Sequence, residues 1–185
     1  AARWRLRFSR GLSNPGRVRY ADSRTDTAGE RMSRTELTPS PDFTLSATGG
    51  TTVSISALRG TPLVLYFYPK DNTPGCTNET AAFRDHYAAF QAAGCAVFGL
   101  SRDSLRSHEN FKAKLEVPFE LISDPDEIAC AAFDVMKMKN MYGKQVRGLE
   151  RSTFVIDREG RIAHAWRGVK VPGHVEEVLA CVQGL

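Results

Sequence analysis

The arrangement of apolar and polar positions predicts β-structure in three parts of the chain. Residues 43–55 alternate around a Gly-Gly pair, which is typical of a β-hairpin. The longest apolar run, Leu63–Tyr68, lies between two prolines and is expected to form a buried central strand. Thr153–Ile156 and Ile162–Trp166 flank a turn at Asp157–Gly160 and predict a second hairpin.

Between these strands the apolar spacing becomes helical. A helix is expected from about Cys76 to Ala92, because Phe83, Tyr87 and Phe90 recur at i, i+4 and i+7. Gly94 is expected to end it. A second helix is predicted to close the chain at His174–Val182.

The segments in between are shorter, and their pattern is weaker. We interpret the Met- and Lys-rich stretch Met136–Gly148 as a loop. The other predicted elements are a strand at Ala96–Leu100, a helix from Asp103 or Ser104 to about Leu115, a strand at Phe119–Ile122 and a short helix at Asp124–Phe133 with Pro125 in its first turn. Alternating strands and helices with a late hairpin predict a single α/β domain without internal repeats.

The positive charge of the chain is confined to its beginning. The formal net charge is +4, but residues 1–31 carry eight arginines against three acidic residues, so the remainder has a net charge of −1. Charge therefore gives no support for a nucleic-acid partner of the folded body. No apolar run approaches the ~18 residues of a membrane span, which excludes an obvious transmembrane segment.

These differences divide the chain into a disordered basic extension, residues 1–31, and one domain, residues 32–185. Three hypotheses for the extension remain open. It is an upstream segment from an early start or an expression vector, an Arg-rich transit peptide, or a genuine basic tail. A secretory signal is not predicted, because no apolar core of such a signal is present.

The cysteines and histidines show no spacing typical of a metal site or a CxxC redox pair. We therefore predict no metal and no cofactor, and a cytoplasmic protein with reduced thiols. His108 and His164 are expected at surface or strand positions. Three thiols are expected mainly to pack in the core or to be bystanders: Cys95, Cys130 and Cys181.

The fourth thiol, Cys76, lies at the predicted first turn of a helix directly after the central strand. Unpaired N–H groups and the partial positive charge of the helix N-terminus favour its thiolate. The hydroxyl of Thr73 can donate to that thiolate or to a bound oxygen. Gly75 lets the backbone approach an oxygen ligand, and Pro69, which lacks an N–H, can shield the sulfur from water.

Two charged residues complete the candidate site, one of them far downstream in the sequence. Arg151, at the start of a predicted strand, is the candidate guanidinium, and Glu79, one helical turn after Cys76, can orient it. A thiolate that attacks a peroxide needs such donors, because negative charge develops on the leaving oxygen. The pattern therefore predicts peroxide reduction.

Residues 37–185 resemble the peroxiredoxin family, specifically the peroxiredoxin Q or bacterioferritin comigratory protein subfamily. The segment from Tyr66 to Thr77, which contains Pro69-x-x-x-Thr73-x-x-Cys76, is similar to that subfamily's active-site motif. Later segments similar to the subfamily follow in the same order: Arg84-Asp85, Gly99–Ser104 and Arg151–Asp157. The resemblance implies a thioredoxin-like fold, with a central mixed sheet flanked by helices and an N-terminal β-hairpin.

The resemblance also implies roles for individual residues. Cys76 would be the peroxidatic cysteine of a thiol-dependent peroxidase for hydrogen peroxide and organic hydroperoxides, with Pro69, Thr73 and Arg151 completing the site. A monomer or a small dimer is implied as well.

The chain departs from the subfamily where a resolving cysteine is expected. Ala81 stands five residues after Cys76, and the helical run Phe111–Lys114 contains no cysteine. We therefore expect a one-cysteine enzyme whose sulfenic acid is reduced by an external thiol, with thioredoxin, glutaredoxin and glutathione all open. Cys130 remains a weak candidate for resolution.

Two other hypotheses compete with the peroxidase. A thioredoxin-like disulfide oxidoreductase would require a CxxC pair, but Glu79 occupies the position where the second cysteine would stand. A thiol-based redox sensor would use the same sulfenic acid as a signal, and the motif alone does not separate it from an enzyme.

Overall fold

The computed structural model describes residues 38–185, so the predicted extension at residues 1–31 lies outside the described part. Eight strands form one mixed sheet. In order across the sheet they are β1 (Thr38–Pro39), β10 (Arg161–Arg167), β9 (Ser152–Ile156), β4 (Leu63–Phe67), β5 (Ala96–Ser101), β6 (Leu121–Ser123), β2 (Thr44–Ala47) and β3 (Thr51–Ser54). β4 runs parallel to β5 and antiparallel to β9, which confirms the predicted mixed sheet.

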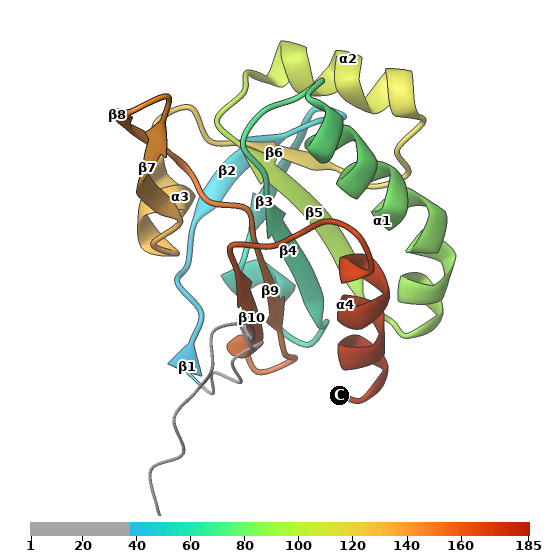
Figure 1. Ribbon diagram of the computed structural model, residues 1–185. Coiled ribbons are helices and arrows are strands. Elements are labelled where there is room, and N and C mark those ends of the chain that lie inside the picture. Colours follow the sequence, from blue (N-terminus) through green and yellow to red (C-terminus); the bar gives the residue numbers. More distant parts are fainter. Residues whose placement is uncertain (1–37) are drawn as a thin grey trace, which may run out of the picture. The chain divides into compact units, whose positions relative to one another are not determined.

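Helices cover both faces of this sheet (Figure 1). They are α1 (Pro74–Ala92), α2 (Leu105–Leu115), α3 (Ile128–Ala132) and α4 (His174–Gln183), with a short 3-10 turn at Ser56–Leu58. α1 and α4 pack side by side on one face, and α3 lies on the other. None of the helices within residues 38–185 is long and apolar enough to cross a membrane.

The central strand β4 divides the core into two apolar layers. All five of its residues are buried, as expected for a strand covered on both faces. Leu65 and Phe67 point into the layer that contains α3, whereas Val64 and Tyr66 point into the layer that contains α1 and α4. The side chains alternate, so β4 holds the two layers together and ends at the candidate site.

The predicted turn and cap residues take up the expected positions. Gly49 and Gly50 both have positive φ angles, 71° and 66°, in the turn between β2 and β3. Gly94, with a φ of 70°, follows the end of α1. Ser104 caps α2, and its hydroxyl accepts a hydrogen bond from the backbone N–H of Ser107.

The prediction of a loop at Met136–Gly148 is wrong. The segment forms an antiparallel hairpin of β7 (Met136–Met141) and β8 (Lys144–Leu149), separate from the main sheet. Tyr142 and Gly143 make a two-residue turn with positive φ angles of 52° and 76°. The Met-Lys-Met-Lys alternation is a strand pattern, but it lacks the β-branched and aromatic residues that favour strands.

The helix predicted at Asp124–Phe133 is shorter than expected and does not include Pro125. Asp124 is buried, and its carboxylate accepts hydrogen bonds from the N–H groups of Ile128 and Cys130. Glu127 has a left-handed backbone conformation, with a φ of 58°, which separates the preceding turn from the helix. The acidic segment thus caps α3 from outside it.

Candidate active site

The register between β4 and β9 brings together residues that are far apart in the sequence. The two strands are antiparallel, and Phe67 at the end of β4 lies opposite Ser152 at the start of β9. Arg151, just before β9, is therefore placed beside the loop that leads from β4 into α1. The backbone carbonyl of Arg151 accepts a hydrogen bond of 3.0 Å from the N–H of Val169, which fixes the position of this segment.

Cys76 is the third residue of α1, and its side chain is buried, with only 1% of the residue exposed. The first intrahelical hydrogen bond runs from the N–H of Thr77 to the carbonyl of Thr73. The N–H groups of Gly75 and Cys76 precede that bond, and Thr73 makes no side-chain cap bond in the described structure. The helix thus presents open donors next to the sulfur, as the sequence predicts.

Arg151 connects the two acidic groups of the site. Its Nη2 donates a hydrogen bond of 3.4 Å to the sulfur of Cys76, and its Nη1 donates to Oε2 of Glu79. A Cβ atom on Gly75 would lie 3.1 Å from the same Nη2. Gly75 is therefore needed mainly because the guanidinium packs against it, a reason that the sequence alone does not reveal.

Glu79 is fully buried, and burial raises the pKa of its carboxyl to about 7, although the charge and hydrogen bond of Arg151 act to lower it. Its Oε1 has no hydrogen-bond partner in the described structure. For Arg151, burial lowers the pKa, but Glu79 and Cys76 raise it by more, so the guanidinium stays charged. This arrangement holds one permanent positive charge beside the Cys76 sulfur.

The two other predicted site residues lie in the loop before α1. The hydroxyl of Thr73 donates a 2.8 Å hydrogen bond to the carbonyl of Lys70, not to the sulfur of Cys76. Donation from Thr73 to the thiolate is thus not seen, because the only hydroxyl proton is already used. Pro69 is half-buried and begins the loop directly after Tyr68.

The remaining cysteines are placed away from Cys76, and all four are free thiols. Cys130 is buried in the apolar layer on the opposite face of the sheet. Cys95 directly precedes β5, whose first residue Ala96 lies opposite Leu63 at the start of β4. Cys76 follows the other end of β4, which is about 15 Å away along the strand. Cys181 lies near Cys95.

Burial also disfavours the thiolate form of these three cysteines. Burial raises the pKa of Cys95 to about 12 and raises the pKa values of Cys130 and Cys181 above the usual value for a thiol. Packing is therefore the role that their surroundings favour, as the sequence predicts.

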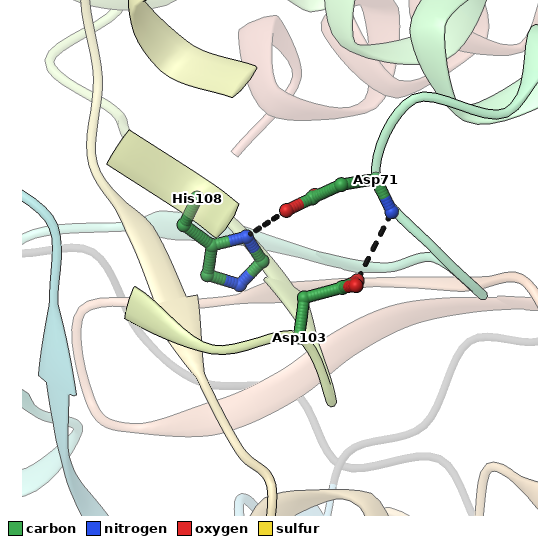
Figure 2. Close-up of side chains that lie close together, drawn as sticks. All are labelled: Asp71, Asp103 and His108. Atoms are coloured by element: carbon green, nitrogen blue, oxygen red, sulfur yellow. Dashed lines mark hydrogen bonds and ion pairs between the residues drawn. The ribbon is translucent and has the colours of Figure 1, made fainter. Parts of the chain in front are cut away.

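The expectation that His108 is a surface or strand residue is wrong. His108 lies in α2 and is fully buried, and its ring contacts Asp71 from the loop before α1 (Figure 2). No local motif could reveal this contact, because the two residues are 37 positions apart.

Asp71, Asp103 and His108 present three metal-type ligand atoms within 4.8 Å of one another. These atoms are already occupied by protein hydrogen bonds. Oδ2 of Asp71 accepts from Ser107 and contacts His108, and Oδ2 of Asp103 accepts from the hydroxyl of Ser101 and the N–H of Asp71. The cluster is therefore best described as a hydrogen-bond network rather than a metal site.

Comparison with known proteins identifies the family. The model of the AhpC/TSA family matches residues 38–165, which include both Cys76 and Arg151. The chain belongs to the AhpC/TSA family. This confirms the resemblance seen in the sequence: the protein is a peroxiredoxin and thus a thiol-dependent peroxidase.

Its relatives place it in the peroxiredoxin Q or bacterioferritin comigratory protein subfamily. The chain is 54% identical over 142 residues to peroxiredoxin Bcp of Xanthomonas campestris, covering 77% of this chain and 89% of that protein. It is 46% identical over 145 residues to peroxiredoxin Bcp of Bacillus subtilis, covering 78% of this chain and 92% of that protein.

A solved structure of the Xanthomonas campestris bacterioferritin comigratory protein, described in connection with its alkyl peroxide reduction activity, matches with a TM-score of 0.74. The two chains are 52% identical, and the match covers 77% of this chain and 90% of that one. The predicted thioredoxin-like fold is thereby confirmed. A disulfide oxidoreductase is not favoured.

Proposed function

We propose that Cys76 is the peroxidatic residue of this peroxiredoxin and reduces hydrogen peroxide and organic hydroperoxides. Its thiolate attacks the terminal oxygen of the peroxide, and an S–O bond forms as the O–O bond breaks. The leaving alkoxide or hydroxide takes up a proton and departs as an alcohol or water, so that Cys76 becomes a sulfenic acid. The observation that carries this proposal is the hydrogen bond from Arg151 to the Cys76 sulfur at an open helix N-terminus.

The groups around the sulfur are hydrogen-bond donors and a positive charge, and the reaction develops negative charge on the leaving oxygen. The guanidinium of Arg151 and the free N–H groups of Gly75 and Cys76 can stabilise the negative charge on the leaving oxygen. Glu79 orients Arg151 through Nη1 and leaves Nη2 for the reacting atoms. Pro69 contributes by excluding water from one side of the site.

The role of Thr73 differs from simple donation. Its hydroxyl proton is held by the carbonyl of Lys70, so its oxygen has lone pairs left to accept a hydrogen bond from the peroxide O–H. Such a contact would orient the attacked oxygen toward the sulfur.

Recycling is proposed to use an external thiol. One thiol condenses with the sulfenic acid to give a mixed disulfide and water, and a second thiol then releases Cys76. Burial of Cys130 on the other face of the sheet and the distant positions of Cys95 and Cys181 support this scheme. Thioredoxin, glutaredoxin and glutathione all remain candidate reductants.

The proposal is tested by peroxide consumption with dithiothreitol as the reductant. Cys76→Ser is expected to abolish turnover, whereas Cys95→Ser, Cys130→Ser and Cys181→Ser are each expected to keep it. Retained turnover in Cys76→Ser would refute the assignment, and loss in Cys130→Ser would refute external recycling. Sustained turnover also separates an enzyme from a redox sensor, since a sensor has no need to recycle quickly.

We further propose that residues 32–185 carry the whole activity, as a monomer or a small dimer in the cytoplasm. The four free thiols support a reducing compartment. Deleting residues 1–31 is expected to leave the rate with peroxide unchanged, and a large loss would mean that the extension is part of the functional chain.

A further inference from the structure

The loop that leads into α1, residues 69–73, is tied to the rest of the described structure by side-chain hydrogen bonds mainly at one residue. The hydroxyl of Thr73 bonds to Lys70 within the loop, its carbonyl accepts only from Thr77 in α1, and Asn72 accepts a long hydrogen bond of 3.5 Å from the exposed Lys114. Asp71, by contrast, is buried, and both its backbone and its side chain bond to residues outside the loop. The position of the loop therefore depends on Asp71.

Asp71 is held by hydrogen bonds of both its side chain and its backbone. Figure 2 shows its contacts with His108 and Asp103. Its Oδ1 accepts a 2.7 Å hydrogen bond from the hydroxyl of Tyr68. Its Oδ2 accepts one of 2.8 Å from the hydroxyl of Ser107 and lies 2.8 Å from Nδ1 of His108. Its backbone N–H donates to Oδ2 of Asp103 across 3.0 Å. With this many partners, the carboxylate can hold only one position.

His108 contacts an acceptor through each of its ring nitrogens. Nδ1 faces the carboxylate of Asp71, and Nε2 lies 3.0 Å from the backbone carbonyl of Ile122. Both neighbours are acceptors, so a ring that satisfies both carries a proton on each nitrogen. The side chains of His108 and Asp71 are 0% and 1% exposed, so their contact is a buried link between α2 and the loop.

The electrostatics of Asp71 agree with this geometry. Burial alone would raise the pKa of its carboxyl, but the hydrogen bonds and the charge of His108 outweigh burial and hold the pKa below its usual value. Removing the partner of such a buried carboxylate is destabilising, because its negative charge is then left without compensation.

The path from Asp71 to the sulfur is short. Asn72 takes a left-handed conformation, with a φ of 60°, and turns the chain sharply from Asp71 into Thr73. Thr73 is extended and immediately precedes the helix whose first residues include Gly75 and Cys76. A shift at Asp71 would thus move the hydroxyl of Thr73 and the N–H groups of Gly75 and Cys76.

We propose that Asp71 and His108 form a buried clamp that positions the peroxide-binding loop, residues 69–73, and with it the start of α1, for attack by Cys76. This inference rests on the proposed function. His108 is a positioning residue, because it acts on the reacting atoms through Asp71 and the loop. The thiolate itself is held from the other side by Arg151, so the clamp is expected to govern the fit of the peroxide more than the reactivity of the sulfur.

Two substitutions of His108 separate its two contacts. The amide nitrogen of Asn in His108→Asn can replace Nδ1 and keep the donor to Asp71. The amide nitrogen of Gln in His108→Gln can replace Nε2 and keep only the bond to Ile122. Asp71→Asn removes the charge from the other side of the clamp. Lys112→Gln is a matched control, because it removes a different ion pair of α2, the one to Glu120.

Each variant is tested with two reagents under pseudo-first-order conditions. The rate with hydrogen peroxide requires a correctly placed loop, whereas the rate of alkylation by iodoacetamide requires only the thiolate. We expect His108→Gln and Asp71→Asn to lose at least about tenfold in the peroxide rate, with no comparable fall in alkylation. His108→Asn is expected to recover most of the peroxide rate, and Lys112→Gln is expected to match the wild type.

A double variant, His108→Gln with Asp71→Asn, is expected to lose little more than either single variant, because the two residues act as one unit. Peroxide rates within twofold of the wild type in both single variants would overturn the clamp. Equal loss in the peroxide and alkylation rates would overturn it too, since that result indicates general damage to the fold. A wild-type protein whose Cys76 is alkylated but does not react with peroxide would instead refute the proposed function.

Discussion

Arg151 donates a hydrogen bond to the sulfur of Cys76 across 3.4 Å, although 75 positions separate the two residues in the sequence. The contact exists because β9 runs antiparallel to β4, so that the start of one strand lies beside the end of the other. The same guanidinium reaches Glu79 through its second amino group. A planar group with fixed donors is suited to serve two partners at once.

Replacement of Arg151 tests this double contact. Arg151→Ala is expected to lower the second-order rate with peroxide by about 10²–10³-fold, as when one donor to a developing oxyanion is removed. Arg151→Lys keeps the charge but cannot bond to Cys76 and Glu79 in the same geometry, so we expect an intermediate rate. Stopped-flow measurement checks both, with Arg147→Lys as the control in an exposed pair with Glu127. A rate for Arg151→Ala within threefold of the wild type would contradict the assigned role.

Gly75→Ala tests the close packing of the guanidinium. The backbone of Gly75 is helical, so the substitution causes no conformational strain, but the new methyl group would lie 3.1 Å from Nη2 of Arg151. We expect the displaced guanidinium to cost about tenfold in the peroxide rate. Gly148→Ala is the matched control, because its methyl group would meet only Cδ of Lys139 at 3.9 Å. Equal rates for the two variants would show that Arg151 moves aside without consequence.

The raised pKa of Glu79 leads us to expect that the free energy of unfolding depends on pH. Its folded pKa of about 7 lies above the ordinary value of 4.5, so the unfolded chain loses this proton first as the pH rises. The stability that protonated Glu79 contributes is present below pH 4.5 and is lost as the pH rises toward 7.

Glu79→Gln removes this titration. The free energy of unfolding of the variant, relative to the wild type, is expected to increase between pH 4.5 and 7 by on the order of 3 kcal/mol. Denaturant melts at several pH values measure it, with Glu159→Gln as a control whose side chain is 66% exposed. A difference that stays constant over this range would mean that Glu79 is ionised throughout.

Much of the fold follows from local pattern. The apolar run that forms β4, the helical spacing of Phe83 and Phe90, and the stop at Gly94 are all local signals, and each element forms where it is predicted. The sequence pattern does not predict the hairpin of β7 and β8, because Met and Lys occupy alternate positions that are usually filled by stronger strand formers.

The site could be predicted only in part. Cys76 and Glu79 share one helix end, so their spacing indicates that they lie together. Arg151 is a candidate because it begins a predicted strand, and the family resemblance implies the same role. The partnership of Asp71 with His108 carries no local signal, because it depends on how α2 packs against the loop. The packing of Gly75 against Arg151 and the bond from Thr73 to Lys70 likewise require three-dimensional structure.

The central claim is that Cys76 attacks peroxide and becomes a sulfenic acid that no other cysteine of the chain resolves. The most direct test treats the protein with stoichiometric peroxide in the presence of dimedone and maps all four cysteines by mass spectrometry. We predict the dimedone adduct on Cys76 and unmodified Cys95, Cys130 and Cys181. Consumption of peroxide with Cys76 left unmodified, or a disulfide between Cys76 and another cysteine of the same chain, would contradict the account.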